Sequence, residues 1–259
     1  MQLQILPNFL FDDYKNQIDF SINEKLNLIT PSEITSDNFA FFSSVSSVYS
    51  SKIEGEEIEL DSFLKHKFSA AQFTPNYTQR ADDLFDAYSF ARNSILNYEN
   101  LITVHQKITQ HILVASSRGK IRQHPEWIIN TNGRIVYVAA SPKIVEIEMK
   151  KLFADIDYLL DQKLTDEQIL FFAACIHLVF VKIHPFEDGN GRTARLLEKW
   201  FLAHFYKDLA WFVESEKYYF EHLTLYFQHL QLGLEYEQTA YAESLPFLSM
   251  LATYLRNKN

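Results

Sequence analysis

An apolar run over residues 169–181, the longest in the sequence, constrains the fold more than any other feature. It falls short of the roughly 20 apolar residues that a bilayer-spanning helix needs. A capping-box pattern at Thr165 and Gln168 opens it, and Pro185 should end it. The run therefore predicts a helix buried in a protein core, around which the other elements must pack.

Glycine is scarce, with six in 259 residues, so helices should dominate this chain. Apolar residues recur at helical spacing over residues 78–98, where Ile95 falls on the apolar face, and over 101–114, which predicts two antiparallel helices. The same spacing predicts a helix beyond Pro142 and another over 192–206. Aromatic-rich helices should complete the chain.

Residues 127–138 depart from this helical pattern. β-Branched and aromatic residues flank Asn132 and Gly133, a pair typical of a type I′ turn. We therefore expect one short β-hairpin in an otherwise all-α fold. Neither a repeat nor a Gly/Ser/Pro-rich linker divides the sequence, which favours one compact unit.

Charge and cysteine content argue against several classes of partner. The net charge is -9 at pH 7, from 24 Lys+Arg and 33 Asp+Glu, so we expect no binding of nucleic acid. Cys175 is the single cysteine, which permits no internal disulfide and suits a reducing cytoplasm. The N-terminus lacks the pattern of a signal or transit peptide. We expect a cytoplasmic protein without a membrane partner.

Reactive side chains are concentrated in residues 184–195, between the apolar helix and the next one. The segment reads His184-Pro185-Phe186-Glu187-Asp188-Gly189-Asn190-Gly191-Arg192-Thr193-Ala194-Arg195. Gly189 and Gly191 let the backbone turn with its N–H groups facing inward, at the start of a helix whose dipole favours anions. Arg192 and Arg195 lie on one helical face and could reach the same polyphosphate. The segment therefore predicts a phosphate-binding loop.

Two further side chains of this loop suggest a reaction. Asp188 supplies a carboxylate suited to Mg²⁺, which proteins bind through one or two carboxylates together with substrate phosphates. The imidazole of His184 is the natural group to take a proton from an attacking hydroxyl. Each residue alone has a plainer interpretation as a helix end, a turn or a solvated face. Together they indicate the transfer of a group from a nucleotide. Phe186 should anchor the loop in the core.

The loop resembles the signature of the Fic (filamentation induced by cyclic AMP) family, His-Pro-Phe-x-Asp-Gly-Asn-Gly-Arg-x-x-Arg. The resemblance covers about residues 78–206. It implies a mainly helical Fic fold and a protein adenylyltransferase, which transfers AMP from ATP to a Ser, Thr or Tyr hydroxyl of a protein. Doc-type relatives that phosphorylate carry Lys where this chain has Gly191, which favours AMP transfer here.

The resemblance also assigns roles to single residues. His184 would be the general base and Asp188 the ligand of the cofactor Mg²⁺. The phosphates of ATP would be bound by Gly189, Asn190, Gly191, Arg192, Thr193 and Arg195. Tyr218 and Tyr219 resemble a tyrosine pair that lines the nucleotide pocket in relatives, although two core aromatics are the plainer interpretation.

A second match lies upstream, at residues 50–55. The sequence Ser-Ser-Lys-Ile-Glu-Gly resembles the family's inhibitory motif, which implies an inhibitory helix over about residues 43–55, N-terminal to the catalytic core. Glu54 would contact Arg195 and occupy the guanidinium that the γ-phosphate needs, and Ser50 is the serine of the same inhibitory motif. Taken alone, the hexapeptide is a helix end with Gly55 as its C-cap. We expect a self-inhibited enzyme.

The hairpin resembles the flap on which relatives bind a target segment by strand addition. This implies target docking at Ile135, Val136, Tyr137 and Val138. The target protein is unknown, and a second copy of this chain is a further candidate partner. We divide the chain into an N-terminal helical region (1–77), a Fic core (78–206) and C-terminal helices (207–259).

Two alternatives stay open at this point. Glu54 could instead align a water molecule that removes AMP from modified proteins, as in some relatives. The chain could also be an interaction module that binds nucleotide without turnover, with the aromatic C-terminal helices as a docking surface.

Overall fold

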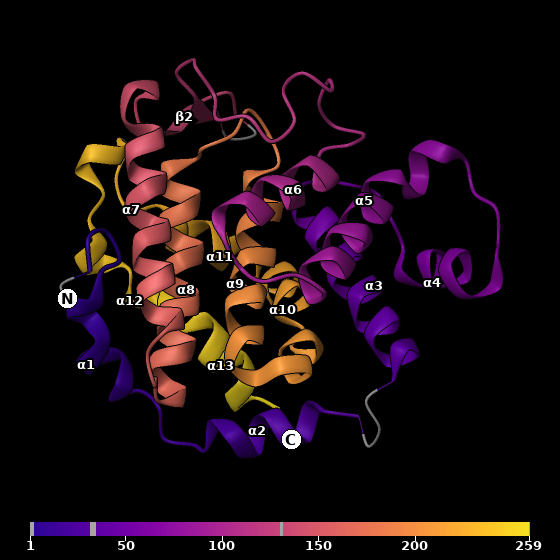
Figure 1. The fold of residues 1–259 in the computed structure, drawn as a ribbon, viewed down its shortest axis with the longest axis horizontal. Helices are drawn as coiled ribbons and strands as arrows, with labels where there is room; N and C mark the ends of the chain where they lie inside the picture. The colour runs from indigo at the N-terminus through magenta and orange to yellow at the C-terminus, as the bar shows by residue number, and fades with distance from the viewer. Residues whose placement is uncertain (1–2, 32–34, 130–131, 259) are drawn as a thin grey trace.

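The computed structural model describes residues 3–31, 35–129 and 132–258, and it is mainly helical with one two-stranded sheet (Figure 1), as predicted. The helices of eight or more residues are α2 (Ile22–Ile29), α3 (Ser36–Ile53), α4 (Leu60–Ser69), α5 (Pro75–Arg92), α6 (Tyr98–Ile108), α7 (Pro142–Leu160), α8 (Asp166–Ile183), α9 (Asn190–Tyr206) and α11 (Leu223–Leu230). The shorter elements are η1 (Asn8–Leu10), α1 (Phe11–Lys15), η2 (Lys207–Phe212), α10 (Ser215–Glu221), η3 (Tyr236–Gln238), η4 (Tyr241–Glu243), α12 (Leu245–Leu248) and α13 (Met250–Arg256).

Helix α8 lies at the centre of the fold and packs against α7 and α9 (Figure 1). Thr165 and Gln168 form the predicted capping box at its start, and it ends at Ile183, before Pro185. From residue 169 to 183 every side chain except Val181 is buried. The prediction of a buried core helix is confirmed. Within the described part of the chain, no helix combines the length and apolarity that crossing a bilayer requires.

The first helix predicted from periodicity is shorter than expected. The pattern predicted a helix over 78–98, but α5 ends at Arg92. Helix α6 starts only after Asn97, whose side chain accepts a backbone N–H of its first turn at 2.8 Å, and this cap interrupts the periodic pattern. Ile95 was wrongly placed on an apolar face, since it is 73% exposed. Helix α6 in turn ends at Ile108, before the predicted residue 114.

The predicted hairpin is present as β1 (Trp127–Ile129) and β2 (Ile135–Val138), which pair antiparallel. Gly133, in the predicted turn, has φ of 73°, and residues 130–131 just before the turn lie outside the described part. Tyr137 is buried and ties the hairpin to α8. Its hydroxyl donates to the Lys182 carbonyl at 2.8 Å, and the Lys182 ammonium lies 4.1 Å from its ring centroid.

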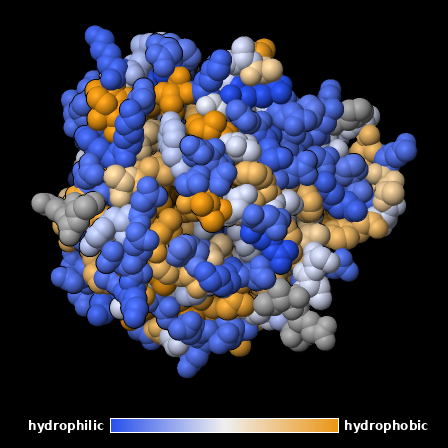
Figure 2. All heavy atoms as spheres, in the orientation of Figure 1, coloured by the Kyte–Doolittle hydropathy of each residue, from blue (hydrophilic) through white to orange (hydrophobic). Residues whose placement is uncertain are grey.

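The main hydrophobic core joins residues from Leu6 to Leu255. A small second cluster, Val48, Ile58, Phe63 and Ala81, packs α4 against α3 and α5. Figure 2 shows a largely hydrophilic face on which hydrophobic residues come through as separate patches.

A single buried carboxylate holds the N-terminal segment. Asp155 on α7 accepts the backbone N–H groups of Gln4, Ile5 and Leu6 at 2.7, 2.8 and 3.0 Å. Buried backbone donors need such partners, because water cannot reach them. Asp155 therefore fixes the start of the chain against the helical core.

We expect Asp155→Ala to lower the free energy of unfolding by about 3 kcal/mol, because backbone donors lose their acceptor in the interior. Urea unfolding at neutral pH measures the loss. Glu146→Ala on the same helix removes an exposed ion pair with Lys150 and serves as the control, with an unchanged midpoint. Equal losses in the two variants would contradict the anchoring role of Asp155.

Candidate active site

The predicted loop forms the tight connection between α8 and α9. His184 ends α8 in the left-handed conformation, with φ of 53°, and Gly189 precedes α9 with φ of 78°. Glycine adopts this conformation without strain, and a Cβ at position 189 would lie 2.7 Å from the Thr109 side chain. Two left-handed residues thus reverse the chain within a few residues.

Side chains from inside and outside the loop fix its shape. The Asn190 amide accepts the N–H of Phe186 at 2.9 Å and donates to its carbonyl at 2.8 Å. Phe186 is buried and stacks on His105 with 3.7 Å between the ring centroids, which confirms it as the anchor. The phosphate-binding role of Asn190 stays a prediction, since its amide spans the loop here.

His105 on α6 is a residue that the sequence analysis missed. The Gly119 N–H donates to its Nδ1 at 2.9 Å, so the imidazole proton lies on Nε2, which donates to the Asp188 carbonyl at 2.9 Å. His105 thus supports the loop through its ring face and its Nε2 atom, while Nδ1 joins it to Gly119 outside the loop. A lone His on an amphipathic helix gave no signal for this role.

The side chain of His184 suits a base. Burial lowers its pKa to about 4, because a charged ring is costly away from water. Among the described residues, no group hydrogen-bonds its buried Nδ1 atom. The Nε group of Arg122 donates to the His184 carbonyl at 2.7 Å and so holds the backbone at this position. A neutral imidazole at pH 7 can accept a proton.

Helix α3 brings the predicted inhibitory residues to the start of α9. Oε1 of Glu54 lies 2.7 Å from Nη2 of Arg195. The Ser50 hydroxyl and carbonyl accept from the same guanidinium at 2.9 and 3.0 Å. Burial acts to raise the pKa of Glu54, but Arg195 and Arg192 outweigh it and hold that pKa below its usual value. The predicted contact is present as a charged pair, on a helix that begins at Ser36 and not near residue 43.

The carboxylate of Glu54 rests against the first turn of α9. A Cβ on Gly191 would lie only 2.5 Å from Oε1 of Glu54. The N-terminus of a helix attracts anions through its free N–H groups and its dipole. Glu54 therefore fills the space in which this helix start would hold an anionic ligand.

Sequence analysis also missed Glu56, which pairs with the other arginine of the loop. Gly55 has φ of 86°, and the N–H groups of Gly55 and Glu56 donate to carbonyls of the last turn of α3 at 3.0 and 3.1 Å, which is a Schellman motif. After this turn, Oε1 of Glu56 lies 3.1 Å from Nη2 of Arg192 and also accepts from Arg80 on α5. The signal for this role in the sequence was the position of Glu56, an acidic residue directly after Gly55 at the end of α3.

The predicted tyrosine pair makes contacts outside residues 184–195. Tyr219 is buried and donates to the Glu198 carboxylate at 3.0 Å, whereas Tyr218 packs on His222 and lines a different surface pocket. Phe220, the residue after Tyr219, lines an opening of about 520 Å³ together with Gly55 and Glu56. Nucleotide contact by the tyrosine pair stays a prediction.

The remaining predicted residues lie in or beside the loop. Thr193 is buried and donates to the Gly189 carbonyl at 2.8 Å. On the flap, Ile135 is 50% exposed and Val136 is half-buried. The N–H of Val138 donates to the Leu234 carbonyl at 2.7 Å, so a segment of the chain itself pairs with that end of β2.

Asp188 is exposed, and one of its carboxylate oxygens accepts the Gly189 N–H at 2.5 Å. The described residues contain no group of three or more His, Cys, Asp or Glu side chains placed to hold a metal. A single exposed carboxylate beside an anion-binding helix start fits Mg²⁺, because this ion takes few protein ligands when it arrives with phosphates.

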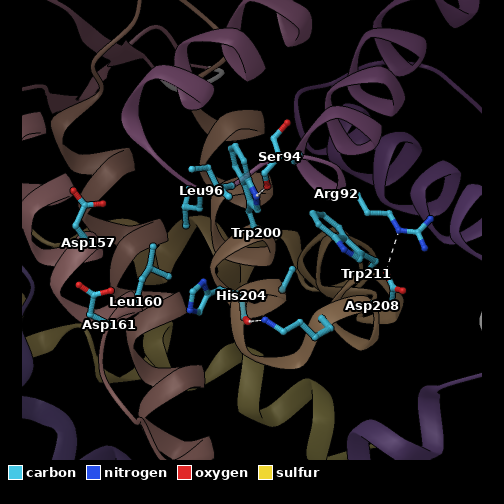
Figure 3. Close-up of a pocket in the computed structure, with 14 residues that line it drawn as sticks. Arg92, Ser94, Leu96, Asp157, Leu160, Asp161, Trp200, His204, Asp208 and Trp211 are labelled. Atoms are coloured by element: carbon cyan, nitrogen blue, oxygen red, sulfur yellow. Dashed lines mark hydrogen bonds and ion pairs between the residues drawn. The ribbon is translucent and has the colours of Figure 1, made fainter.

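An open surface pocket of about 610 Å³ lies at the other end of α9 (Figure 3). Trp200, Trp211 and His204 line it, and Asp157 and Asp161 face it from the end of α7. None of the predicted site residues lines this pocket. We therefore do not assign the reaction to it, although it is large.

Comparison with known proteins bears on this geometry. Residues 95–202, which include the loop, match the Fic/DOC family. This matched segment of the chain is therefore similar to the Fic/DOC family. The protein adenylyltransferase Fic of Nematostella vectensis is 32% identical to this chain over 109 residues, which are 41% of this chain and 22% of the relative. The protein adenylyltransferase fic-1 of Caenorhabditis elegans is 29% identical over 102 residues, 39% of this chain and 18% of the relative.

Solved structures show that the Fic fold extends beyond the matched segment. A Fic family protein from Desulfovibrio desulfuricans superposes with a TM-score of 0.74 at 20% identity, over 98% of this chain and 74% of the other. A Fic domain-containing signaling protein from Bacteroides thetaiotaomicron gives 0.66 at 20% identity, over 94% of each chain. The architecture around the loop is thus shared, whereas the curated relatives are matched over only about a fifth of their length.

We expect the folded protein to lose stability as the pH falls from 6.5 toward 4. Burial lowers the pKa of His105 from 6.5 to about 4, so between these values the unfolded chain binds the extra proton. Acidification therefore favours unfolding, by about 2 kcal/mol at pH 5 for this group. Urea unfolding at pH 7 and pH 5 should show that His105→Gln loses less stability between the two than the unaltered protein. An identical pH dependence would contradict the prediction.

Proposed function

We propose that this chain transfers AMP from ATP to a Ser, Thr or Tyr hydroxyl of a target protein. The observation that carries this proposal is the half-buried His184, whose pKa is lowered, at one end of a loop whose other end places the buried Arg192 and Arg195 at a helix start. A base and a polyphosphate-binding surface on one short loop are what nucleotidyl transfer needs. The named activity of the curated relatives supports the same reaction class.

In this reaction the target hydroxyl oxygen forms a bond to the α-phosphorus while the bond to the pyrophosphate leaving group breaks. His184 would take the hydroxyl proton. Gly189, Gly191 and the first turn of α9 would bind the phosphates through backbone N–H groups, with Asn190 and Thr193 keeping the loop in shape. Arg192 and Arg195 would bind the distal phosphates. The exposed part of β2, Ile135 and Val136, is the proposed docking edge for the target.

Asp188 would hold Mg²⁺ together with the phosphates. When bound, the ion offsets the negative charge of the phosphate groups. The chain's own contribution is the loop geometry. His105 and Phe186 maintain it by stacking on each other, and His105 also donates to the Asp188 carbonyl.

We further propose that the chain is inhibited by its own helix α3. The pairs Glu54 to Arg195 and Glu56 to Arg192 occupy both guanidinium groups that the phosphates would use. The division into an N-terminal region (1–77), a Fic core (78–206) and C-terminal helices (207–259) is part of the same proposal, because it separates the inhibitory helix from the loop that it covers.

We expect Glu54→Gly to raise AMP transfer about tenfold or more, since a charge-assisted pair that competes with ATP is removed. His184→Ala in the same background should abolish transfer. Incubation of both variants with labelled ATP and cell lysate, followed by mass spectrometry, measures the transfer and finds the modified residue. Absence of transfer by Glu54→Gly to itself and to every lysate protein would contradict the proposed activity.

We expect Glu56→Gln to raise transfer severalfold, less than Glu54→Gly, because Arg192 loses its charged partner while Glu54 still blocks Arg195. Glu57→Gln is the matched control, since this neighbouring side chain is exposed and removes the same charge. The same labelled-ATP assay applies. If the two variants behave alike, net charge and not the Arg192 contact explains the effect.

One alternative reaction has a structural argument of its own. The Glu54 carboxylate lies close enough to His184 for its negative charge to act to raise the pKa of the imidazole. The two side chains could therefore align a water molecule against an AMP-modified side chain. Incubation of the unaltered protein with AMP-modified target decides between the two directions. If the unaltered protein releases AMP from the modified target and the Glu54→Gly variant does not, the result favours removal of AMP. Calorimetry that shows ATP binding without turnover in either direction would favour an interaction module.

A further inference from the structure

Four hydrogen bonds hold the buried guanidinium of Arg195, and three of them come from the end of α3. Ser50 accepts two and Glu54 accepts one. The fourth joins Nη1 to the hydroxyl of Tyr226 on α11, at 3.4 Å. Among the described residues, Tyr226 is the partner of Arg195 that does not belong to the inhibitory segment. Its contact can therefore persist when Glu54 gives way to a nucleotide.

A buried network of hydrogen-bonded side chains holds Tyr226 in place. Its hydroxyl lies 3.0 Å from Nε2 of His177 on α8, and Nδ1 of His177 lies 2.8 Å from Oε2 of Glu198. A carboxylate only accepts, so in the neutral ring the imidazole proton lies on Nδ1. Nε2 then accepts the hydroxyl proton of Tyr226, and an oxygen lone pair is left for Arg195. Tyr219 completes the chain by donating to Glu198.

The direction of these hydrogen bonds matters for the guanidinium. Arginine has donors only, so a hydroxyl can support it only as an acceptor. Because the Tyr226 hydroxyl donates its proton to His177, its oxygen can still accept a hydrogen bond from Arg195. Tyr226 and His177 are 2% and 0% exposed, so water does not compete for these bonds. Helix α11 lies outside residues 95–202, which match the family.

We propose that Tyr226, held by His177, is a positioning residue that keeps Arg195 aimed at the start of α9 once Glu54 has moved away. The inference rests on the proposed function, because it takes Arg195 to bind the distal phosphates of a nucleoside triphosphate. A monophosphate lacks those groups. Tyr226 should therefore matter for ATP and not for AMP.

Calorimetric titration with ATP and with AMP, each with Mg²⁺, tests this in the Glu54→Gly background. Adding Tyr226→Phe should weaken ATP binding about tenfold, the loss typical of one hydrogen bond to a charged group, and leave AMP binding unchanged. Tyr254→Phe in the same background is the matched control. It removes a buried hydroxyl that accepts the Glu214 N–H at 2.9 Å and that is not among the hydrogen-bond partners of Arg195 in the described part of the chain, so it should change the melting temperature at most.

The ratio of ATP affinity to AMP affinity separates positioning from general destabilisation. An unchanged ATP affinity in the Tyr226→Phe variant would overturn the inference, and so would equal losses for ATP and AMP. If the Glu54→Gly protein itself binds no ATP, the proposed function fails and the inference falls with it. A lower ratio in Tyr226→Phe alone, with normal binding in Tyr254→Phe, supports the positioning role.

Discussion

The candidate site depends on a buried arginine in the first turns of α9, because this arginine requires an acidic partner. Arg195 is 1% exposed, and a charge at this depth is costly unless it is paired and hydrogen-bonded. Further along the same helix Lys199, also 1% exposed, donates to Glu216 on α10 and to Ser46 on α3, both at 2.6 Å. Helix α9 thus carries buried cations on the side that faces α3 and α10. Those elements must supply oxygen atoms to it.

Helix α3 meets this requirement with small polar side chains. Its buried serines are Ser43, Ser44, Ser46, Ser47, Ser50 and Ser51. Beside these serines α3 buries apolar side chains, among them Val45, Val48 and Ile53, while the carboxylate of Glu54 at the helix end pairs with Arg195. This arrangement supports the proposed inhibitory role, because a carboxylate at the helix end can be displaced by another anion.

The sequence predicted those parts of the fold that local patterns determine. The capping box at Thr165, the buried run of α8 and the anchor Phe186 follow from spacing and polarity alone. Local patterns failed where a competing local signal was stronger, as at Asn97, which starts a new helix inside a periodic run. They also failed where partners are distant in sequence. Nothing near His105 indicates that it will support a loop more than 80 residues away.

Arg122 links the fold of the loop to the chemistry proposed for it. This buried side chain donates to the carbonyls of His184, His124, Ala140 and Ile183, so it satisfies the last carbonyls of α8 and joins them to the segment after the flap. A residue other than glycine in the left-handed conformation costs about 1 kcal/mol, and such strain persists only where the surroundings impose it. The bond to the His184 carbonyl imposes it here. Burial is the main reason that the pKa of the imidazole is low, and the positive charge of Arg122 adds to it, so this side chain both holds the backbone of His184 in its strained conformation and helps to keep the ring neutral.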